Sequence, residues 1–231
     1  MSIQLITFDL DDTLWDVSPV MQDAEAALRN WLGMYAPRLG AVPIEHLWTI
    51  RAQLLQAEPS LKYRLSELRR RILLGALTGA GYPSGEAATL AEGGFQVFLA
   101  ARHQVELFAE VHPTLETLAN RFQLGVITNG NADIRRLGLA DYFQFALCAE
   151  ELGVGKPDPK PFQEALKRAG IAAQHAVHVG DHPCDDIAGA QAAGLRAIWF
   201  NPQGNTWEGD KRADGEIRSL AELPALLHSW A

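Results

Sequence analysis

Five short apolar runs, each four to six residues long, are the feature that most constrains the fold of this 231-residue chain. Four of them are rich in Val, Ile or Phe, and helical patterns separate those that follow residue 113. Buried strands that alternate with helices form a parallel sheet with helices on both faces. The sequence therefore predicts an α/β fold with strands at Ile3–Phe8, Gln123–Thr128, Phe145–Ala149, Ala176–Gly180 and Ala197–Phe200.

Helices are expected between the later strands, where apolar residues recur at helical spacing. Gly194 follows the last of these segments, in the position that favours glycine after a helix C-terminus. The predicted helices cover Pro113–Asn120, Ala132–Leu137, Pro161–Ala169 and Asp185–Ala193.

The long interval after the first strand has a different pattern, because its apolar residues recur every three or four positions. Helix-breaking residues divide it into roughly four helices, enough for a small bundle core, at Pro37, Pro43, Pro59 and Gly79–Pro83. The α/β pattern begins before this interval and resumes after it. We therefore predict a Rossmann-like parallel-sheet core, residues 1–15 and 110–231, with an inserted helical domain, residues 16–109.

Composition and charge exclude several classes of protein. The chain has 28 acidic and 20 basic side chains, a net charge of −8, which disfavours binding to nucleic-acid backbones and anionic membranes. No apolar run reaches the roughly 18 residues of a membrane span, the N-terminal residues lack a signal-peptide pattern, and two cysteines give no disulfide framework. We expect a cytoplasmic protein with neither nucleic-acid nor membrane partners; no pattern specifies an oligomeric state.

Three carboxylates follow the first predicted strand: Asp9, Asp11 and Asp12. Open α/β sheets bind ligands at the carboxyl ends of their strands. Carboxylates this close together repel one another unless a cation or a shared proton holds them, and Mg2+ prefers such oxygen ligands. The segment is therefore a candidate metal and catalytic site; the alternative is a solvated acidic turn or a helix cap formed by Asp12 or Thr13.

Three later segments place further polar groups at predicted strand ends. Thr128–Asn131 offers a hydroxyl and turn amides to a phosphoryl oxygen, or is only a structural turn. Lys156 stands in a proline-rich loop that can aim its ammonium at an anion, or it is a surface lysine. Asp181 directly follows the fourth strand, where it can share a cation with Asp9.

Asp181 is followed by an acidic pair, Asp185 and Asp186, at the start of a predicted helix. Acidic residues there commonly cap the helix or complement its dipole, and we expect one of the two to do so. His178 and His182 are interpreted as core or loop histidines, since a transition-metal site requires further ligands at defined spacing.

Taken in order, these segments resemble the four signature motifs of the haloacid dehalogenase superfamily. The matching residues are Asp9-Leu10-Asp11-Asp12-Thr13, Thr128-Asn129, Lys156-Pro157, and Gly180-Asp181 followed five positions later by Asp186. The match covers the whole chain in the correct order. The helical interval, residues 16–109, looks like the cap domain that this family inserts after its first motif.

The resemblance implies a phosphate monoester hydrolase that forms an aspartyl phosphate on Asp9. Asp11 is implied to protonate the leaving alcohol and then to activate water, while Thr128 and Lys156 stabilise the phosphoryl oxygens. It further implies a bound Mg2+ and a small-molecule phosphate ester as substrate. The implied metal ligands are Asp9, the backbone carbonyl of Asp11 and Asp181. Asp186 is implied either to bind the metal directly or to contact one of these ligands. The implied substrate contacts are Leu10, Asn129 and Gly130.

Asp11 distinguishes between branches of the superfamily. Metal-independent dehalogenases use the same aspartate on carbon and lack an acid two residues later, and phosphonate hydrolases lack it as well. Asp11 therefore favours phosphate ester chemistry. A phosphomutase keeps this acid and stays an open alternative, while the intact motifs disfavour a non-catalytic binding protein.

The inserted interval contains a basic stretch in an otherwise acidic chain. Arg69, Arg70 and Arg71 either contact a polar leaving group or form a solvated helix face with a pair such as Glu67 and Arg71. The inserted sequence, including Gln56-Ala57-Glu58-Pro59 and the Arg-rich helix after it, is similar, together with Thr128–Asn131, to bacterial phosphatases that hydrolyse the ribityl-phosphate intermediate of riboflavin biosynthesis. The similarity implies a ribitylaminouracil phosphate as substrate, and broad sugar-phosphate or nucleotide hydrolysis is the alternative.

Overall fold

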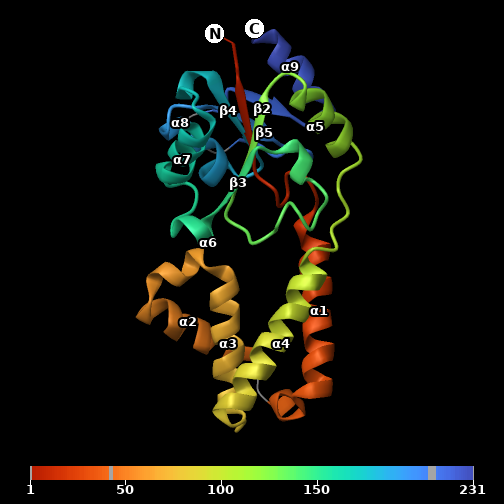
Figure 1. The fold of residues 1–231 in the computed structure, drawn as a ribbon, viewed down its shortest axis with the longest axis vertical. Helices are drawn as coiled ribbons and strands as arrows, with labels where there is room; N and C mark the ends of the chain where they lie inside the picture. Colours follow the sequence, from red (N-terminus) through yellow and green to blue (C-terminus); the bar gives the residue numbers. More distant parts are fainter. Residues whose placement is uncertain (1, 42–43, 208–211, 231) are drawn as a thin grey trace. The chain divides into compact units, whose positions relative to one another are not determined.

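The computed structural model describes residues 2–41, 44–207 and 212–230. The chain divides into two compact units, one formed by Met1–Asp16 with Glu106–Ala231 and the other by Val17–Val105. The first unit holds every described strand, and the second is helical (Figure 1). The protein is thus a Rossmann-like α/β core with an inserted helical unit.

The chain leaves the α/β unit after Asp16 and returns at Glu106. Leu107 forms a bridge with Trp15, and the backbone amide of Phe108 donates to the carbonyl of Leu14 at 3.0 Å. These contacts join the returning segment to the outgoing one. The α/β unit therefore resumes a few residues before the boundary predicted at residue 110.

The sheet has six strands in the order β3-β2-β1-β4-β5-β6, and all neighbouring strands are parallel. The strands are β1 (Leu5–Phe8), β2 (Gln123–Thr128), β3 (Phe145–Cys148), β4 (Ala176–Gly180), β5 (Arg196–Phe200) and β6 (Gly215–Ile217). β1 and β4 are buried along their whole length, and most of their residues are accordingly apolar. Because the strand order reverses beside β1, its carboxyl end is the expected ligand-binding point.

All five predicted strands are present, and β2 and β4 have the predicted bounds. The edge strand β6 was not predicted, because the three residues Gly215–Ile217 form no apolar run. It is defined by its pairing with β5, in which Ile217 lies opposite Phe200.

Helices cover both faces of the sheet (Figure 1). They are α5 (Val111–Ala119), α6 (Ala149–Leu152), α7 (Pro159–Ala169), α8 (Gly189–Ala192) and α9 (Leu223–Ser229), with short 3-10 turns at Ala140–Tyr142, Ala173–His175 and Leu220–Glu222. A π-helix, η5 (Pro183–Ala188), leads into α8, and Gly194 ends this segment with a φ of 87°. The prediction of a helix at Ala132–Leu137 is wrong: the segment forms a turn that Gly138 ends with a φ of 69°.

The inserted unit contains the four predicted helices, α1 (Val17–Tyr35), α2 (Ile44–Ala57), α3 (Leu65–Gly79) and α4 (Ser84–Arg102), with 3-10 helices η1 (Pro37–Ala41) and η2 (Pro59–Tyr63). The predicted breaks at Pro37, Pro59 and Gly79–Pro83 separate them, while Pro43 lies outside the described residues. Helices α1 and α4 pack so closely that a Cβ on Gly93 would lie 2.8 Å from the ring of Trp31.

We expected neither a disulfide nor a membrane-spanning helix. Cys148 and Cys184 are both free thiols, as expected. Within the residues described, no helix combines the length and the apolar character that a bilayer span requires.

Candidate functional site

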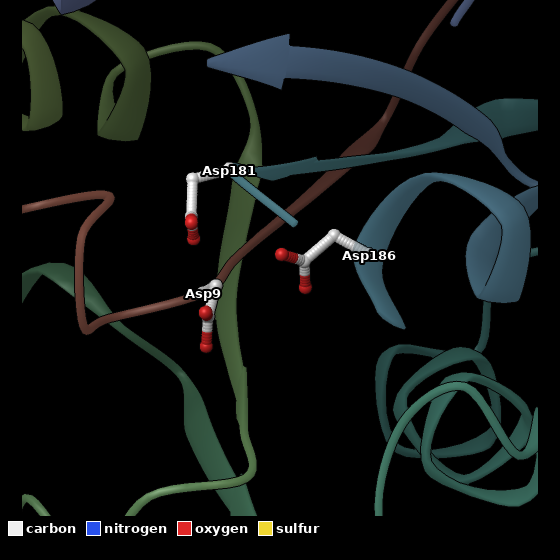
Figure 2. A group of neighbouring side chains, drawn as sticks. All are labelled: Asp9, Asp181 and Asp186. Carbon is white, nitrogen blue, oxygen red and sulfur yellow. The ribbon is translucent and has the colours of Figure 1, made fainter. Parts of the chain in front are cut away.

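The ends of β1 and β4 bring three carboxylates together. Asp9 follows β1, Asp181 follows β4, and Asp186 lies in η5. One oxygen of each lies within 4.8 Å of the others (Figure 2). Phe8 pairs with Val179 in the sheet, and the amide of Asp9 donates to the carbonyl of Val179 at 2.9 Å. The parallel pairing of β1 with β4 therefore fixes the distance between Asp9 and Asp181.

Asp186 reaches this cluster because Gly180 has no side chain. A Cβ on Gly180 would lie 2.3 Å from Cγ of Asp186. The Asp186 carboxylate is fully buried; Oδ1 lies 3.0 Å from Nε2 of His178, and Oδ2 accepts a hydrogen bond from the amide of His182 at 2.9 Å. The close approach of Asp186 to the backbone thus depends on glycine at position 180.

Replacing Gly180 with Ala is expected to lower the free energy of unfolding by about 1–3 kcal/mol, because the added carbon overpacks a buried site. The same change should displace Asp186 and lower the activity. Urea denaturation measures the first effect. Gly33→Ala is the matched control: it adds a carbon to an exposed part of α1 with nothing within 4 Å, and should raise stability by about 0.5–1 kcal/mol. A Gly180→Ala protein as stable as the wild type would contradict this account.

Lys156 is the cation beside the carboxylates. Its Nζ lies 2.5 Å from Oδ1 of Asp186 and 2.8 Å from Oδ1 of Asp9, and its side chain is 1% exposed. The loop that carries it is held by Asn129, which accepts from the Lys156 amide at 2.8 Å and donates to the Lys156 carbonyl at 2.9 Å. Lys156 is therefore a fixed part of the cluster and not a surface lysine.

The charges of the cluster do not balance, since three carboxylates meet one ammonium. Burial raises the pKa of Asp9 to about 8; Lys156 opposes this rise, and the neighbouring carboxylates support it. Burial, with Asp186 and Asp12, raises the pKa of Asp181 to about 6. Although burial opposes it, Lys156 holds the pKa of Asp186 well below its usual range. The site therefore favours an additional cation or proton beside Asp9 and Asp181.

The loop after β1 carries Asp11 next to this cluster in sequence. Asp11 is partly buried, and its backbone bridges to Trp15. Asp12 is exposed and adopts a φ of 57°, a left-handed conformation that aspartate tolerates. The hydroxyl of Thr13 donates to Oδ1 of Asp181 at 3.4 Å. Thr13 thus contacts the cluster, and the segment is more than a solvated acidic turn.

The turn after β2 has the structural role that was one of the two alternatives, while contact of its hydroxyl with a phosphoryl oxygen stays a prediction. Oγ1 of Thr128 is buried and accepts a hydrogen bond from the amide of Gly130 at 3.0 Å, which closes the turn. The side chain of Asn129, a predicted substrate contact, is engaged with the Lys156 loop and with Asp185, to which it donates at 3.2 Å. Leu10, also a predicted substrate contact, is fully buried.

Two contributors to the site were missed in the sequence. His178 is fully buried against Asp186, although its position in an apolar run indicated only a core residue. Trp199 in β5 donates its indole Nε1–H to the carbonyl of Asp181 at 2.7 Å, which supports the turn that carries this carboxylate. No local sequence signal identifies either contact: the first depends on the π-helix that returns Asp186 to β4, and the second on the pairing of β4 with β5.

The arginines of the inserted unit are paired with glutamates. The predicted helix-face pair of Glu67 and Arg71 is present, and Glu58 joins it at 2.7 Å from Arg71. Arg69 lies 2.7 Å from Glu25, and Arg70 lies 2.7 Å from Glu92. The predicted ion pair is therefore present, but the face is not simply solvated, because the guanidinium groups of Arg69 and Arg70 lie over the buried rings of Phe98 and Phe95.

Comparison with known proteins agrees with these observations. A family model for haloacid dehalogenase-like hydrolases matches residues 3–194. A 5-amino-6-(5-phospho-D-ribitylamino)uracil phosphatase of Escherichia coli is 33% identical over 97% of this chain and 96% of its own length. A phosphoserine phosphatase of Thermus thermophilus is 31% identical over 86% of this chain and 89% of its own length.

Solved structures extend the comparison. The crystal structure of a 2-haloacid dehalogenase from Pseudomonas syringae is 65% identical, covers 99% of this chain and all of its own, and superposes with a TM-score of 0.98. A magnesium-bound HAD hydrolase of Bacillus subtilis is 25% identical over 98% of this chain and 99% of its own, with a TM-score of 0.66. With a family model and a phosphatase that both match most of its length, this chain belongs to the haloacid dehalogenase-like hydrolase family.

Proposed function

We propose that the protein is a Mg2+-dependent phosphate monoester hydrolase that acts on a small metabolite through an aspartyl phosphate on Asp9. The observation that carries the proposal is Asp11, a second, partly buried carboxylate two residues beyond Asp9, in the loop that leaves the cluster of Asp9, Asp181 and Asp186. Transfer of phosphate from an alcohol requires a proton for the leaving oxygen, whereas a halide leaves without one. The pair Asp9 and Asp11 supplies both a nucleophile and that acid.

The residues present fit a magnesium ion. Oδ1 of Asp9 is buried, and among the described residues no donor reaches it with hydrogen-bond geometry, although Lys156 lies 2.8 Å away. Carboxylate oxygens are the ligands that Mg2+ prefers, and the excess negative charge favours a cation. The ion would be held by Asp9, Asp181 and the backbone carbonyl of Asp11. Asp186 would either bind the ion directly or contact one of its ligands. When bound, the ion neutralises charge on a phosphoryl group.

The remaining chemistry belongs to the side chains. A carboxylate oxygen of Asp9 attacks phosphorus as the bond from phosphorus to the leaving oxygen breaks, and Asp11 gives that oxygen its proton. Asp11 then takes a proton from water, which attacks the aspartyl phosphate, releases inorganic phosphate and restores Asp9. Thr128 and Lys156 stabilise the charge on the phosphoryl oxygens.

For the substrate, we propose the ribitylaminouracil phosphate on which the Escherichia coli relative acts by name. Support comes from a match over nearly the full length of both chains. Relatives named as phosphatases of phosphoserine and glyceraldehyde 3-phosphate match at similar identity, so broad phosphatase activity is the alternative. A phosphomutase is a further alternative, because it would keep the same motifs.

A second candidate function is 2-haloacid dehalogenation, since the 65% identical structure from Pseudomonas syringae carries that name. In this reaction Asp9 would attack carbon and displace halide, and Asp11 would have no proton to deliver. The two candidates therefore differ in their need for a metal and in their need for Asp11.

The proposed function predicts that phosphate release from p-nitrophenyl phosphate requires Mg2+. Chelation with EDTA should lower kcat/KM by at least about 100-fold, because the ion contributes several kcal/mol of transition-state stabilisation. Readdition of Mg2+ should restore the rate. Phosphate release is measured in parallel with halide release from 2-chloropropionate. Halide release in EDTA without phosphatase activity would instead establish the dehalogenase.

The same assay identifies the substrate when it is extended to a panel of metabolite phosphates. The ribitylaminouracil phosphate, phosphoserine, sugar phosphates and nucleotides are compared by kcat/KM. The proposed substrate should rank first. Similar values across the panel would favour the broad phosphatase.

A further inference from the structure

A buried line of polar groups runs from the sheet into the carboxylate cluster. Oγ1 of Thr7 lies 2.9 Å from Nδ1 of His178, whose Nε2 lies 3.0 Å from Oδ1 of Asp186. The same oxygen lies 2.5 Å from Nζ of Lys156, which lies 2.8 Å from Asp9. Thr7 and His178 are fully buried and pair directly across β1 and β4. Two side chains of the sheet interior are therefore connected to the site.

The position of each proton in this line follows from its partners. Asp186 is ion-paired with Lys156, so its carboxylate can only accept, and Nε2 of His178 must donate to it. In the neutral ring the other nitrogen, Nδ1, is an acceptor, and the hydroxyl of Thr7 donates to it. The alternative acceptor for Thr7, the carbonyl of Val177, is more distant at 3.4 Å.

The surroundings fix the ring as well as its protons. Phe162 of α7 meets the His178 ring edge to face, with ring centroids 5.2 Å apart. On the other side of the carboxylate, the amide of His182 holds Oδ2 of Asp186 at 2.9 Å. The carboxylate plane is therefore defined by His182 at one oxygen and by His178 with Lys156 at the other.

We propose that Thr7 and His178 are positioning residues for this site. The carboxylate of Asp186 places the His178 proton on Nε2, and that N–H holds the orientation of Asp186 toward Lys156, while the hydroxyl of Thr7 holds the ring at Nδ1. The part that concerns the metal rests on the proposed function, in which Asp186 faces the ion. Hydrogen bonds of this kind to a ligand commonly change metal affinity or activity by about 10- to 100-fold.

The tautomer is measured without metal or substrate. Long-range 1H–15N correlation spectra of the imidazoles distinguish a ring that is protonated at Nε2 from one protonated at Nδ1, and the His178→Gln spectrum assigns the signal. We expect the Nε2–H form in the wild type and in Thr7→Val, with the Nδ1 chemical shift changed in Thr7→Val because the hydroxyl that contacts this nitrogen is lost. Thr114→Val, which changes a buried threonine on α5, should leave the His178 signal unchanged. A wild-type ring with its proton on Nδ1 alone, which could not donate to Asp186, would overturn the proposal.

Magnesium affinity provides the second measurement, by titration calorimetry of the full chain. His178→Leu should weaken binding about 10- to 100-fold. His178→Gln should recover most of this loss, because its amide N–H2 reaches the place of Nε2–H. Thr7→Val should weaken binding less than His178→Leu, and Thr114→Val should not change it.

These outcomes separate the inference from the proposed function. If a folded His178→Leu or Thr7→Val protein binds Mg2+ as tightly as the wild type, the positioning role is wrong and the proposed function stands. If the wild type binds no Mg2+, the proposed function fails, and the tautomer spectra alone decide the inference. Should His178→Leu not fold, the contrast between Thr7→Val and Thr114→Val gives the same decision.

Discussion

Asp9→Asn is expected to lower kcat for p-nitrophenyl phosphate by at least about 1,000-fold, the largest effect of any substitution in this chain. The amide cannot attack phosphorus, so the two-step path through an aspartyl phosphate is lost. The measurement is initial-rate phosphate release at saturating Mg2+. Mass spectrometry of protein quenched during turnover should find a phosphoryl adduct in the wild type and none in Asp9→Asn.

Two controls make this result specific. Asp141→Asn changes an exposed aspartate of the same α/β unit and should keep wild-type activity. Loss of the fold is tested by thermal unfolding without metal. The folded-state pKa of Asp9, about 8, is above its usual 3.8, so its contribution to stability is lost as the pH rises through about 8. Asp9→Asn should therefore be no less stable than the wild type at pH 9. Undiminished activity would refute the nucleophile assignment.

The sheet could be predicted because its strands carry their own signal. β1, β2 and β4 are almost wholly buried, so apolar residues predominate in each strand whatever its neighbours are. β6 has no such signal and exists through its pairing with β5. The helix predicted at Ala132–Leu137 does not form, because helical spacing over only six residues is too short to outweigh the turn that Gly138 ends.

The identities of the cluster residues were predictable because strand ends of a parallel sheet meet at one edge. Asp9, Asp181 and Lys156 were predicted from this rule, and the structure places their charged atoms together. The hydrogen bonds were not predictable. Thr7 and His178 are 171 positions apart, and only the register of β1 against β4 makes them partners.

The role of Asn129 also required the structure. The sequence Thr-Asn-Gly-Asn suggested a turn whose polar groups face a phosphate. In the structure both ends of the Asn129 amide bond the backbone of Lys156, 27 positions away. A Cβ on Gly155 would lie 2.4 Å from Oδ1 of Asn129, so this loop is packed against the amide. The side-chain amide of Asn129 therefore holds the loop that carries the lysine, and contact of Asn129 with substrate stays a prediction.

Asp11→Asn is the substitution that decides between the two candidate reactions. If the protein is a phosphatase, kcat/KM for an alkyl phosphate, which reports the first transfer to Asp9, should fall about 100- to 10,000-fold, because the leaving alkoxide no longer receives a proton. The loss should be smaller for p-nitrophenyl phosphate, since nitrophenolate leaves readily without one. If the protein is a dehalogenase, halide release from 2-chloropropionate should be unchanged, because halide needs no proton.

Two further measurements separate this acid role from a structural one. Asp12→Asn removes the adjacent carboxylate, and asparagine tolerates the φ of 57° at this position, so most of the activity should remain. Magnesium affinity of Asp11→Asn should match the wild type, because the proposed ligand at this position is the backbone carbonyl. A structural defect would lower the rates for alkyl and aryl phosphates equally and weaken Mg2+ binding as well. An unequal loss between the two esters, with unchanged metal affinity, is therefore the result that identifies Asp11 as the proton donor.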